Sequence, residues 1–254
     1  MLDEKTRALL GDREAQEAFT ARGELTVLDL CGGSGSWSRP FQQAGYDVRI
    51  ITLPDYDVLT YEPPGNVWGI IAAPPCTEFS VLNCKAEPRQ RKPEEGLKVV
   101  MACLRIIEKC KPVWWALENP VGYLREYMGP SKLIFQPWEY GDPWTKRTEI
   151  WGEFHVPEKL YKRWEDVPNK LPIYTRPGRG KPNFAYLHKS AQSLIPQLEW
   201  ANPQTDADFR AITPPGFARA FYEANKVETW NTRPPLLTPT QMAVLEKLEE
   251  NHDE

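Results

Sequence analysis

Hydrophobic positions in the first half of the chain fall into two patterns, short continuous apolar runs and one long run with helical spacing. Apolar runs at 25–31, 46–53, 67–72 and 112–117 predict buried strands. Between the last two, residues 94–110 place apolar side chains three and four positions apart, which predicts an amphipathic helix. Strands followed by helices in this way indicate an α/β fold, with a Rossmann-like sheet and helices on both faces.

A glycine-rich loop follows the first predicted strand. Gly32, Gly33 and Gly35 stand between that strand and a segment, 37–45, of helical character. Strand, glycine loop and helix form the first unit of a Rossmann-like fold, in which a ligand approaches the backbone closely. A dinucleotide site carries a third glycine where this chain has Ser38. Together with Asp29 near the strand end, this departure favours an adenosylmethionine site over an NAD site.

A cysteine stands directly after the third predicted strand and two prolines. Pro74 and Pro75 have fixed φ angles and no N–H group, so the chain leaves the sheet stiffly and holds Cys76 at one place. In open α/β sheets, ligands and chemistry lie at this end of the strands. We therefore interpret Cys76 as a nucleophile rather than as a packing residue.

A carboxylate ends the fourth predicted strand. Glu118 follows the apolar run 112–117 and is expected at the same sheet edge as Cys76. A buried carboxylate is costly unless it is hydrogen-bonded or functional. A glutamate that only braces a loop is the alternative, but the convergence of two reactive groups favours function.

The second half of the chain is rich in prolines and irregular. Residues 167–198 contain no Asp or Glu but five Lys or Arg side chains, with aromatic residues between them. Basic residues neutralise phosphates and aromatic rings stack on bases, so this stretch is the candidate nucleic-acid surface; a basic loop without a partner is the alternative. An amphipathic helix is predicted after Gly216 and a peripheral one over 3–20.

Composition narrows the class of protein. The 254 residues are 41% hydrophobic and 26% charged, as in a globular protein with a sizeable core. The net charge is −4, so a nucleic-acid surface must be a local patch. Five cysteines without a CxxC pair argue for a reducing compartment and against disulfides or a structural zinc site. With no apolar run of membrane length and no signal-peptide layout, we expect a soluble cytoplasmic protein.

In this order, the motifs resemble those of the cytosine-5 DNA methyltransferases, and the short chain resembles a compact, phage-type member. The glycine loop is similar to the adenosylmethionine motif, and Pro-Pro-Cys to the catalytic motif. Further matches are Glu118-Asn119-Pro120, Lys146-Arg147-Thr148, and a C-terminal motif at Thr213-Pro214-Pro215-Gly216. The resemblance implies a class I methyltransferase sheet with a small irregular target-recognition region.

The resemblance also implies a mechanism and a partner. Cys76 would attack C6 of a cytosine flipped out of double-stranded DNA, Glu118 would hold a proton at N3, and Arg147 would orient the base. S-adenosyl-L-methionine, or a modified analogue, would be the donor, and the protein would act as a monomer. The implied cofactor residues are Asp29, Cys31, Gly32, Gly33, Ser34, Gly35, Ser36, Trp37, Leu53, Asp57, Val58, Pro74 and Asn119. The implied DNA contacts are Ser80, Lys146, Arg176, Arg179, Lys181 and Lys189.

The predicted organisation has five parts: a peripheral helix (1–24), a catalytic domain (25–153), a small basic recognition region (154–205), a returning helix (206–230) and an acidic tail (231–254). Two departures from the family stand out. Leu53-Pro54 takes the place of the acidic residue that binds ribose, and Glu149 takes that of a second arginine.

Four functions stay open on the sequence. They are methyl transfer to cytosine C5 in DNA, related chemistry with a modified donor or on free pyrimidine nucleotides, DNA binding without catalysis, and an NAD-linked oxidoreductase. A role in restriction-modification or in phage DNA modification fits the first.

Overall fold

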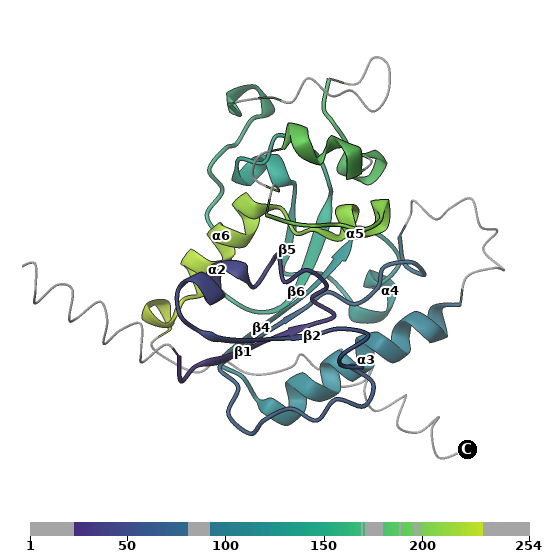
Figure 1. Cartoon of the computed structure of the whole chain (residues 1–254), viewed down its shortest axis with the longest axis vertical. Coiled ribbons are helices and arrows are strands. Elements are labelled where there is room, and N and C mark those ends of the chain that lie inside the picture. The colour runs from purple at the N-terminus through teal and green to yellow at the C-terminus, as the bar shows by residue number, and fades with distance from the viewer. Residues whose placement is uncertain are drawn as a thin grey trace, which may run out of the picture.

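The computed structural model describes residues 23–80, 92–168, 170, 180–187, 189–195, 198 and 200–230. Its centre is a six-stranded sheet in the order β2-β1-β3-β4-β6-β5 (Figure 1). The first four of these run parallel, and β6 runs antiparallel to both of its neighbours. The strands are β1 (Thr26–Leu30), β2 (Asp47–Ile51), β3 (Gly69–Ala72), β4 (Trp114–Pro120), β5 (Leu133–Phe135) and β6 (Thr148–Glu153).

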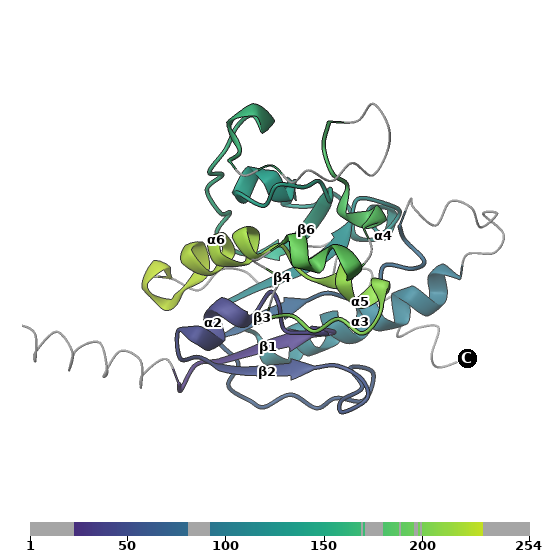
Figure 2. The same cartoon turned by 45° about the horizontal axis from the view of Figure 1, so that its top comes forward.

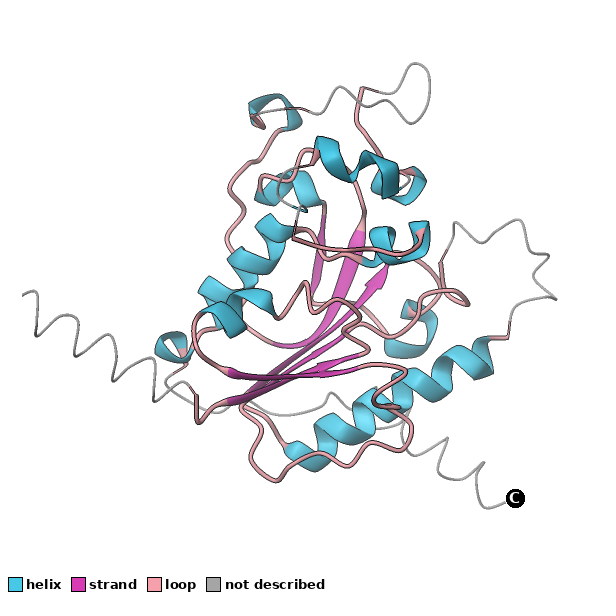
Figure 3. Cartoon of the chain, in the orientation of Figure 1, coloured by secondary structure: helices cyan, strands magenta, loops and turns pink. Residues whose placement is uncertain are grey.

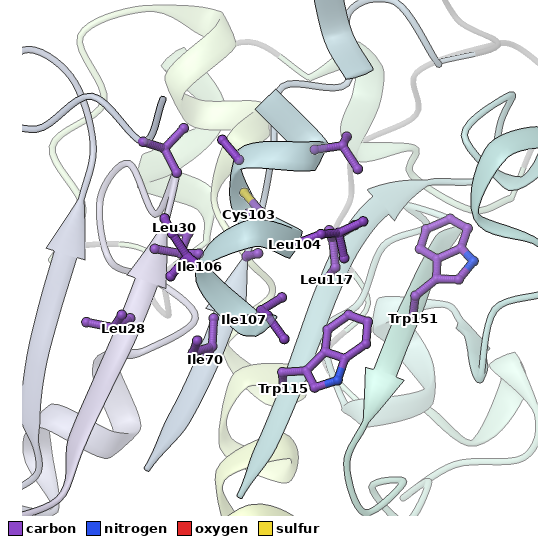
Figure 4. Packing of buried hydrophobic residues seen from close by; sticks show 14 of the residues in the cluster. Leu28, Leu30, Ile70, Cys103, Leu104, Ile106, Ile107, Trp115, Leu117 and Trp151 are labelled. Carbon is purple, nitrogen blue, oxygen red and sulfur yellow. The ribbon is translucent and has the colours of Figure 1, made fainter. Parts of the chain in front are cut away.

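Helices cover both faces of the sheet (Figures 1 and 2). On one face lies α3 (Pro93–Cys110), whose apolar side packs on alternate strand residues such as Leu28, Ile70 and Leu117 (Figure 4). On the other lie α2 (Arg39–Gln43) and α6 (Pro215–Asn225), which pack through aromatic rings onto the intervening residues. Burial of these two apolar faces is the main favourable term for the fold.

The sheet has a topological switch between β1 and β3. The chain leaves β1 toward the face covered by α2, and it leaves β3 toward the face covered by α3. The loops that follow these two adjacent strands therefore diverge, and the carboxyl ends of the strands are left accessible to a ligand. The glycine loop follows β1 and the Pro-Pro-Cys turn follows β3, so this switch brings both motifs to one edge.

Short helices gather beyond the carboxyl ends of the strands (Figure 3). Those of the second half are η3 (Pro137–Tyr140), η4 (Trp164–Asp166), η5 (Phe184–Tyr186), η6 (Lys189–Leu194) and α5 (Asp206–Ala211); α4 (Arg125–Met128) follows β4. By contrast, η8 (Val227–Thr229) follows α6 and lies beside Tyr46, which directly precedes β2. A separate hydrophobic cluster, here called the second core, holds η5, η6 and α5 together. It consists of Trp144, Phe184, Leu187, Ile195, Leu198, Ala201, Phe209 and Ile212.

The elements agree with the sequence pattern where apolar runs are long. The α/β class with a Rossmann-like sheet and helices on both faces is confirmed, as are the four parallel strands and α3. Two bounds differ: β4 continues through Pro120 because β6 pairs with it, and the helix expected over 37–45 covers only Arg39–Gln43. The short elements α4, β5 and α5 were not predicted. The expected helix over 3–20 and the tail 231–254 lie outside the described residues.

No helix in the described ranges is both long enough and apolar enough to cross a bilayer.

The C-terminal motif closes the fold against the glycine loop. The Thr213 N–H donates to Ser36 Oγ at 2.8 Å, and the Gly216 N–H at the start of α6 donates to Asp142 Oδ2 at 2.9 Å. Gly216 lies so close to η3 that a Cβ there would stand 2.2 Å from the Tyr140 carbonyl oxygen. The loop after β1 and the helix that ends the fold are therefore one packed unit.

The buried carboxyl group of Asp142 makes the stability of the fold depend on pH. Burial raises its pKa to about 7, although N–H groups of Gly216 and Phe217 favour the charged form. Because this folded-state pKa exceeds the usual value near 4, the wild-type chain should lose stability as the pH rises from about 4 to about 7.

The variant Asp142→Asn keeps an oxygen that accepts from Gly216 but does not ionise. Its unfolding free energy minus that of wild type should therefore increase between pH 4.5 and 8, as measured by urea denaturation at several pH values. A difference that is constant over this range, or that decreases, contradicts a raised pKa at Asp142.

Candidate active site

The turn after β3 presents Cys76 at the carboxyl edge of the sheet. The Cys76 carbonyl oxygen accepts the N–H groups of Phe79 at 3.0 Å and Ser80 at 2.8 Å, which closes a tight turn directly after the cysteine. Phe79 is fully buried beneath it, whereas Cys76 itself is half-buried. The thiol therefore lies on an anchored turn and remains partly accessible.

Residues from the end of β4 fix this turn on both sides. Asn119 is fully buried, and its Nδ2 donates to the Pro74 carbonyl oxygen at 3.1 Å. On the other side, the Tyr123 N–H donates to the Phe79 carbonyl oxygen at 2.8 Å, and Ser80 forms an isolated bridge with Gly122. The strand that carries Glu118 thus also positions the turn that carries Cys76.

Cys76 and Glu118 interact electrostatically, as expected if both side chains lie at the same sheet edge. Burial raises the pKa of the Cys76 thiol, and the nearby Glu118 carboxylate raises it further. Burial also raises the pKa of Glu118. The carboxyl group therefore retains its proton to a higher pH than an exposed glutamate, and a proton donor stands beside a thiol.

The cation near this pair is Lys146. Its charge lowers the pKa of both Cys76 and Glu118, in opposition to burial. Arg147 is exposed, and its charge acts on Glu149 instead. That Arg147 orients a base stays a prediction, and Lys146, assigned to DNA by sequence, lies nearer the reactive groups.

Glu149 is fully buried on β6, where it pairs with Asn119 of β4. Burial raises its pKa, and the charges of Arg125 and Arg147 oppose this increase. The Arg125 Nη2 atom lies 3.4 Å from Glu149 Oε1. The cytosine-5 methyltransferases that the sequence resembles carry an arginine at this position. This chain has an acid there, and the guanidinium groups beside it belong to Arg125 and Arg147.

The glycine loop adopts a tight conformation over the end of β1. Cys31, Gly33 and Gly35 have φ angles of 57°, 54° and 69°, in the left-handed region that glycine adopts without strain. The backbone of Gly33 is exposed, and a Cβ there would meet no atom within 4 Å. A ligand can therefore approach the backbone at Gly33 and Ser34, which is also exposed.

Beneath this loop lies a buried acid. Ser38, at the position of the missing third glycine, donates through Oγ to Asp29 Oδ2 at 2.5 Å. Asp29 Oδ1 is buried and has no hydrogen-bond partner among the described residues. Burial raises the pKa of Asp29 to about 6. A positively charged ligand above the loop would be attracted to this carboxylate, which fits the sulfonium and ammonium groups of adenosylmethionine.

The loop after β2 exposes apolar side chains at the same edge. Leu53, Tyr56 and Leu59 are 70%, 52% and 47% exposed, whereas Val58 is buried in the core beneath α3. Asp57 is exposed, and its Oδ1 accepts the Leu59 N–H at 2.9 Å, so it also caps this turn. An exposed apolar surface is suited to the flat face of an adenine ring.

Like Val58 and Asn119, two predicted cofactor residues at the glycine loop are buried. Trp37 packs its ring against Phe217 and Phe221 of α6, at centroid distances of 5.8 and 5.2 Å. Ser36 is buried and bound to Thr213. The structure places both in the support of the loop rather than at its surface.

The predicted DNA-binding residues differ in burial and in their contacts. Ser80 is buried beside the Cys76 turn. Lys181 lies over the rings of Trp138 and Trp164, and the Lys189 ammonium donates to the Gln204 carbonyl oxygen at 2.7 Å. Arg176 and Arg179 lie outside the described residues.

Cys103 and Cys110 are core residues of α3. Cys31, Cys76, Cys103 and Cys110 are all free thiols. In the described ranges, no group of three or more His, Cys, Asp or Glu side chains is placed to hold a metal ion.

Comparisons with known proteins give limited further information. No protein-family model matches this chain, and no curated protein matches it significantly. Among solved structures, the chain is similar to one from E. coli described as a "putative DNA modification methyltransferase encoded within prophage". The identity is 19%, the TM-score is 0.39, and the match covers 51% of this chain and 46% of the other, so it spans about half of either protein. The function is therefore argued from the residues of this chain.

Gly32 offers a direct test of the glycine loop. A Cβ at this position would lie 2.4 Å from the Asp29 carboxyl carbon, so Gly32→Ala must displace either the loop or the buried acid. We expect a loss of about 1–3 kcal/mol in unfolding free energy, together with weaker adenosylmethionine binding by calorimetry.

The matched control is Gly65→Ala, where a Cβ meets nothing within 4 Å. It should leave both quantities nearly unchanged. Equal behaviour of the two variants would show that the loop does not require glycine at position 32.

Proposed function

We propose that this protein transfers a methyl group from S-adenosylmethionine to C5 of cytosine in DNA, through a covalent bond between Cys76 and C6. One observation carries the proposal. Cys76 follows β3, Glu118 lies near the end of the adjacent parallel strand β4, and the two groups interact at the edge where the glycine loop also lies. A thiol, a buried carboxyl group of raised pKa and an adenosylmethionine-type loop are together what this reaction needs.

The chemistry assigns a role to each group. Cytosine C5 is too weakly nucleophilic to accept a methyl group, so the ring must first be activated. The Cys76 thiolate gives its electron pair to C6, and Glu118 stabilises the charge that develops at N3 by holding a proton there. Bound adenosylmethionine supplies an electrophilic methyl group. A water molecule then takes the C5 proton, the sulfur–C6 bond breaks with its electron pair returning to Cys76, and the N3 proton returns to Glu118, which restores the aromatic ring and the thiolate.

Other residues of the chain support these groups. Asn119 holds the Pro74 carbonyl and so fixes the direction in which the Cys76 turn leaves β3. Asp29 and the backbone of Gly33 and Ser34 would hold the charged end of the cofactor. Leu53, Tyr56 and Leu59 would contact its adenine. Because a paired cytosine cannot reach Cys76 inside a duplex, the base must be flipped out of the DNA.

The nucleophile is tested by Cys76→Ser. The variant should bind DNA and adenosylmethionine but lose methyl transfer by more than a hundredfold, because a serine hydroxyl at neutral pH is a far weaker nucleophile than a thiolate. Mass spectrometry of nucleosides from treated DNA measures this, and DNA with 5-fluorocytosine should trap the wild-type protein covalently but not the variant.

Cys110→Ser is the control, because Cys110 lies at the far end of α3, beside the start of β4. This variant should retain both activity and trapping. Methylation by Cys76→Ser at the wild-type rate would overturn the assignment.

The acid is tested by Glu118→Gln. The amide cannot provide the proton that N3 needs, so kcat should fall on the order of a hundredfold with little change in KM for DNA. Glu153→Gln, at the opposite end of the same strand pair, is the control and should leave kcat unchanged. A Glu118→Gln effect confined to KM would assign Glu118 to DNA binding instead.

The product distinguishes the remaining alternatives. A modified donor would yield a cytosine adduct of different mass, and a nucleotide enzyme would act on dCMP but not on DNA. An inactive DNA-binding protein would yield no product with any donor. An NAD-linked oxidoreductase would bind NAD, which the missing third glycine disfavours.

A further inference from the structure

We propose that Lys146 is the positioning cation of the Cys76–Glu118 pair, and that the second core holds its ammonium in place through a backbone carbonyl of α5. This inference rests on the proposed function for its role in methyl transfer. Its geometry concerns the protein alone and can be tested without DNA or cofactor.

Strand register gives Lys146 its direction. Glu118 of β4 pairs with Ile150 of β6, so these two side chains lie on the same face of the sheet. The Val121 N–H donates to the Arg147 carbonyl oxygen at 3.1 Å, so the pairing with β4 continues just before β6, and counting back by twos from Ile150 reaches Thr148 and then Lys146. The same alternation directs Arg147 and Glu149 to the opposite face. Of the two adjacent basic residues, only Lys146 therefore shares a face with the Glu118 carboxylate.

Hydrogen bonds fix Lys146 at both its backbone and its ammonium. Its N–H donates to Gln136 Oε1 at 3.1 Å, and its carbonyl oxygen accepts from Thr148 Oγ at 2.8 Å. The Nζ atom donates to the Arg210 carbonyl oxygen at 3.0 Å. An ammonium has three N–H groups, and Arg210 is its one hydrogen-bond partner among the described residues, so donors remain for a substrate.

The segment that carries Lys146 is joined directly to the second core. The preceding residue, Thr145, donates its N–H to the Pro182 carbonyl at 2.8 Å and accepts the Phe184 N–H at 2.9 Å. Trp144 stacks on Phe184 with a centroid distance of 5.2 Å, and both rings belong to the second core. Movement of that core therefore displaces Lys146 relative to Cys76.

Among the described residues, the charges that act on Cys76 are Glu118 from β4 and Lys146 from the segment before β6. They act in opposite directions: the carboxylate disfavours the thiolate and the ammonium favours it. Removal of the ammonium takes away the larger of the two contributions that oppose burial and Glu118, the other being a backbone hydrogen bond. The thiolate fraction at neutral pH should then fall, whether or not the protein methylates DNA.

The experiment measures alkylation of Cys76 by iodoacetamide as a function of pH, with peptide mass spectrometry to separate this thiol from the other four. In Lys146→Met, the alkylation rate at pH 7.5 should fall on the order of tenfold and its pH profile should move to higher pH. Lys146→Arg keeps the charge and should restore most of the rate. Arg147→Met, which removes the neighbouring exposed charge, should match wild type.

Urea unfolding of each variant separates loss of charge from loss of structure. If Lys146→Met does not fold, Lys146→Gln, which retains a donor toward Arg210 without a charge, takes its place in the comparison. An unchanged pH profile in the folded neutral variant overturns the proposal, as does an Arg147→Met profile that shifts equally. A shifted profile in a protein that yields no methylated cytosine would retain the Lys146 assignment and reject only the proposed function.

Discussion

The start of the Cys76 turn depends on one side-chain hydrogen bond, from the buried Asn119 amide to the Pro74 carbonyl oxygen, whereas backbone contacts of Tyr123 and Gly122 hold its end. Two successive prolines supply no N–H group through which the sheet could hold the turn after β3. The side chain of a neighbouring strand must therefore do so. Because Asn119 directly follows Glu118, the residue that positions the nucleophile is attached to the proton donor, and neither can move far without the other.

The burial of Cys76 and Glu118 gives the second core a role in the chemistry of the site. Cys76 and Glu118 both have raised pKa values because water is excluded around them, and a thiolate is costly to form there without a cation. Lys146 supplies that cation, but a flexible lysine loses considerable side-chain entropy when it is held in one place. The α5 carbonyl and the Thr145 hydrogen bonds provide that anchoring, so a region outside the sheet contributes to the chemistry at its edge.

The sequence allowed the central sheet and the positions of Cys76 and Glu118 to be predicted, because buried parallel strands are continuous apolar runs that end where chemistry is placed. It assigned Arg147 to the base and Lys146 to DNA, whereas in the structure the charge of Lys146 acts on Cys76 and Glu118. That difference depends on the pairing of β6 with β4, a long-range register that local pattern does not contain. Ser38 was seen only as a missing glycine, although its hydroxyl binds the buried Asp29. The short α5 was missed because tertiary packing of Phe209, not periodicity, stabilises it.

Glu149 stands where the motif that the sequence resembles has an arginine, yet arginine side chains still lie beside it. A buried carboxylate on β6 would be unfavourable alone, and its raised pKa records that cost. The charges of Arg125 from α4 and of Arg147, which directly precedes β6, oppose the increase. The sheet edge therefore contains two ionic groupings on opposite faces, Glu118 with Lys146 and Glu149 with the arginines. The strand alternation that separates them keeps the arginines away from the thiol and leaves Lys146 as its cationic neighbour.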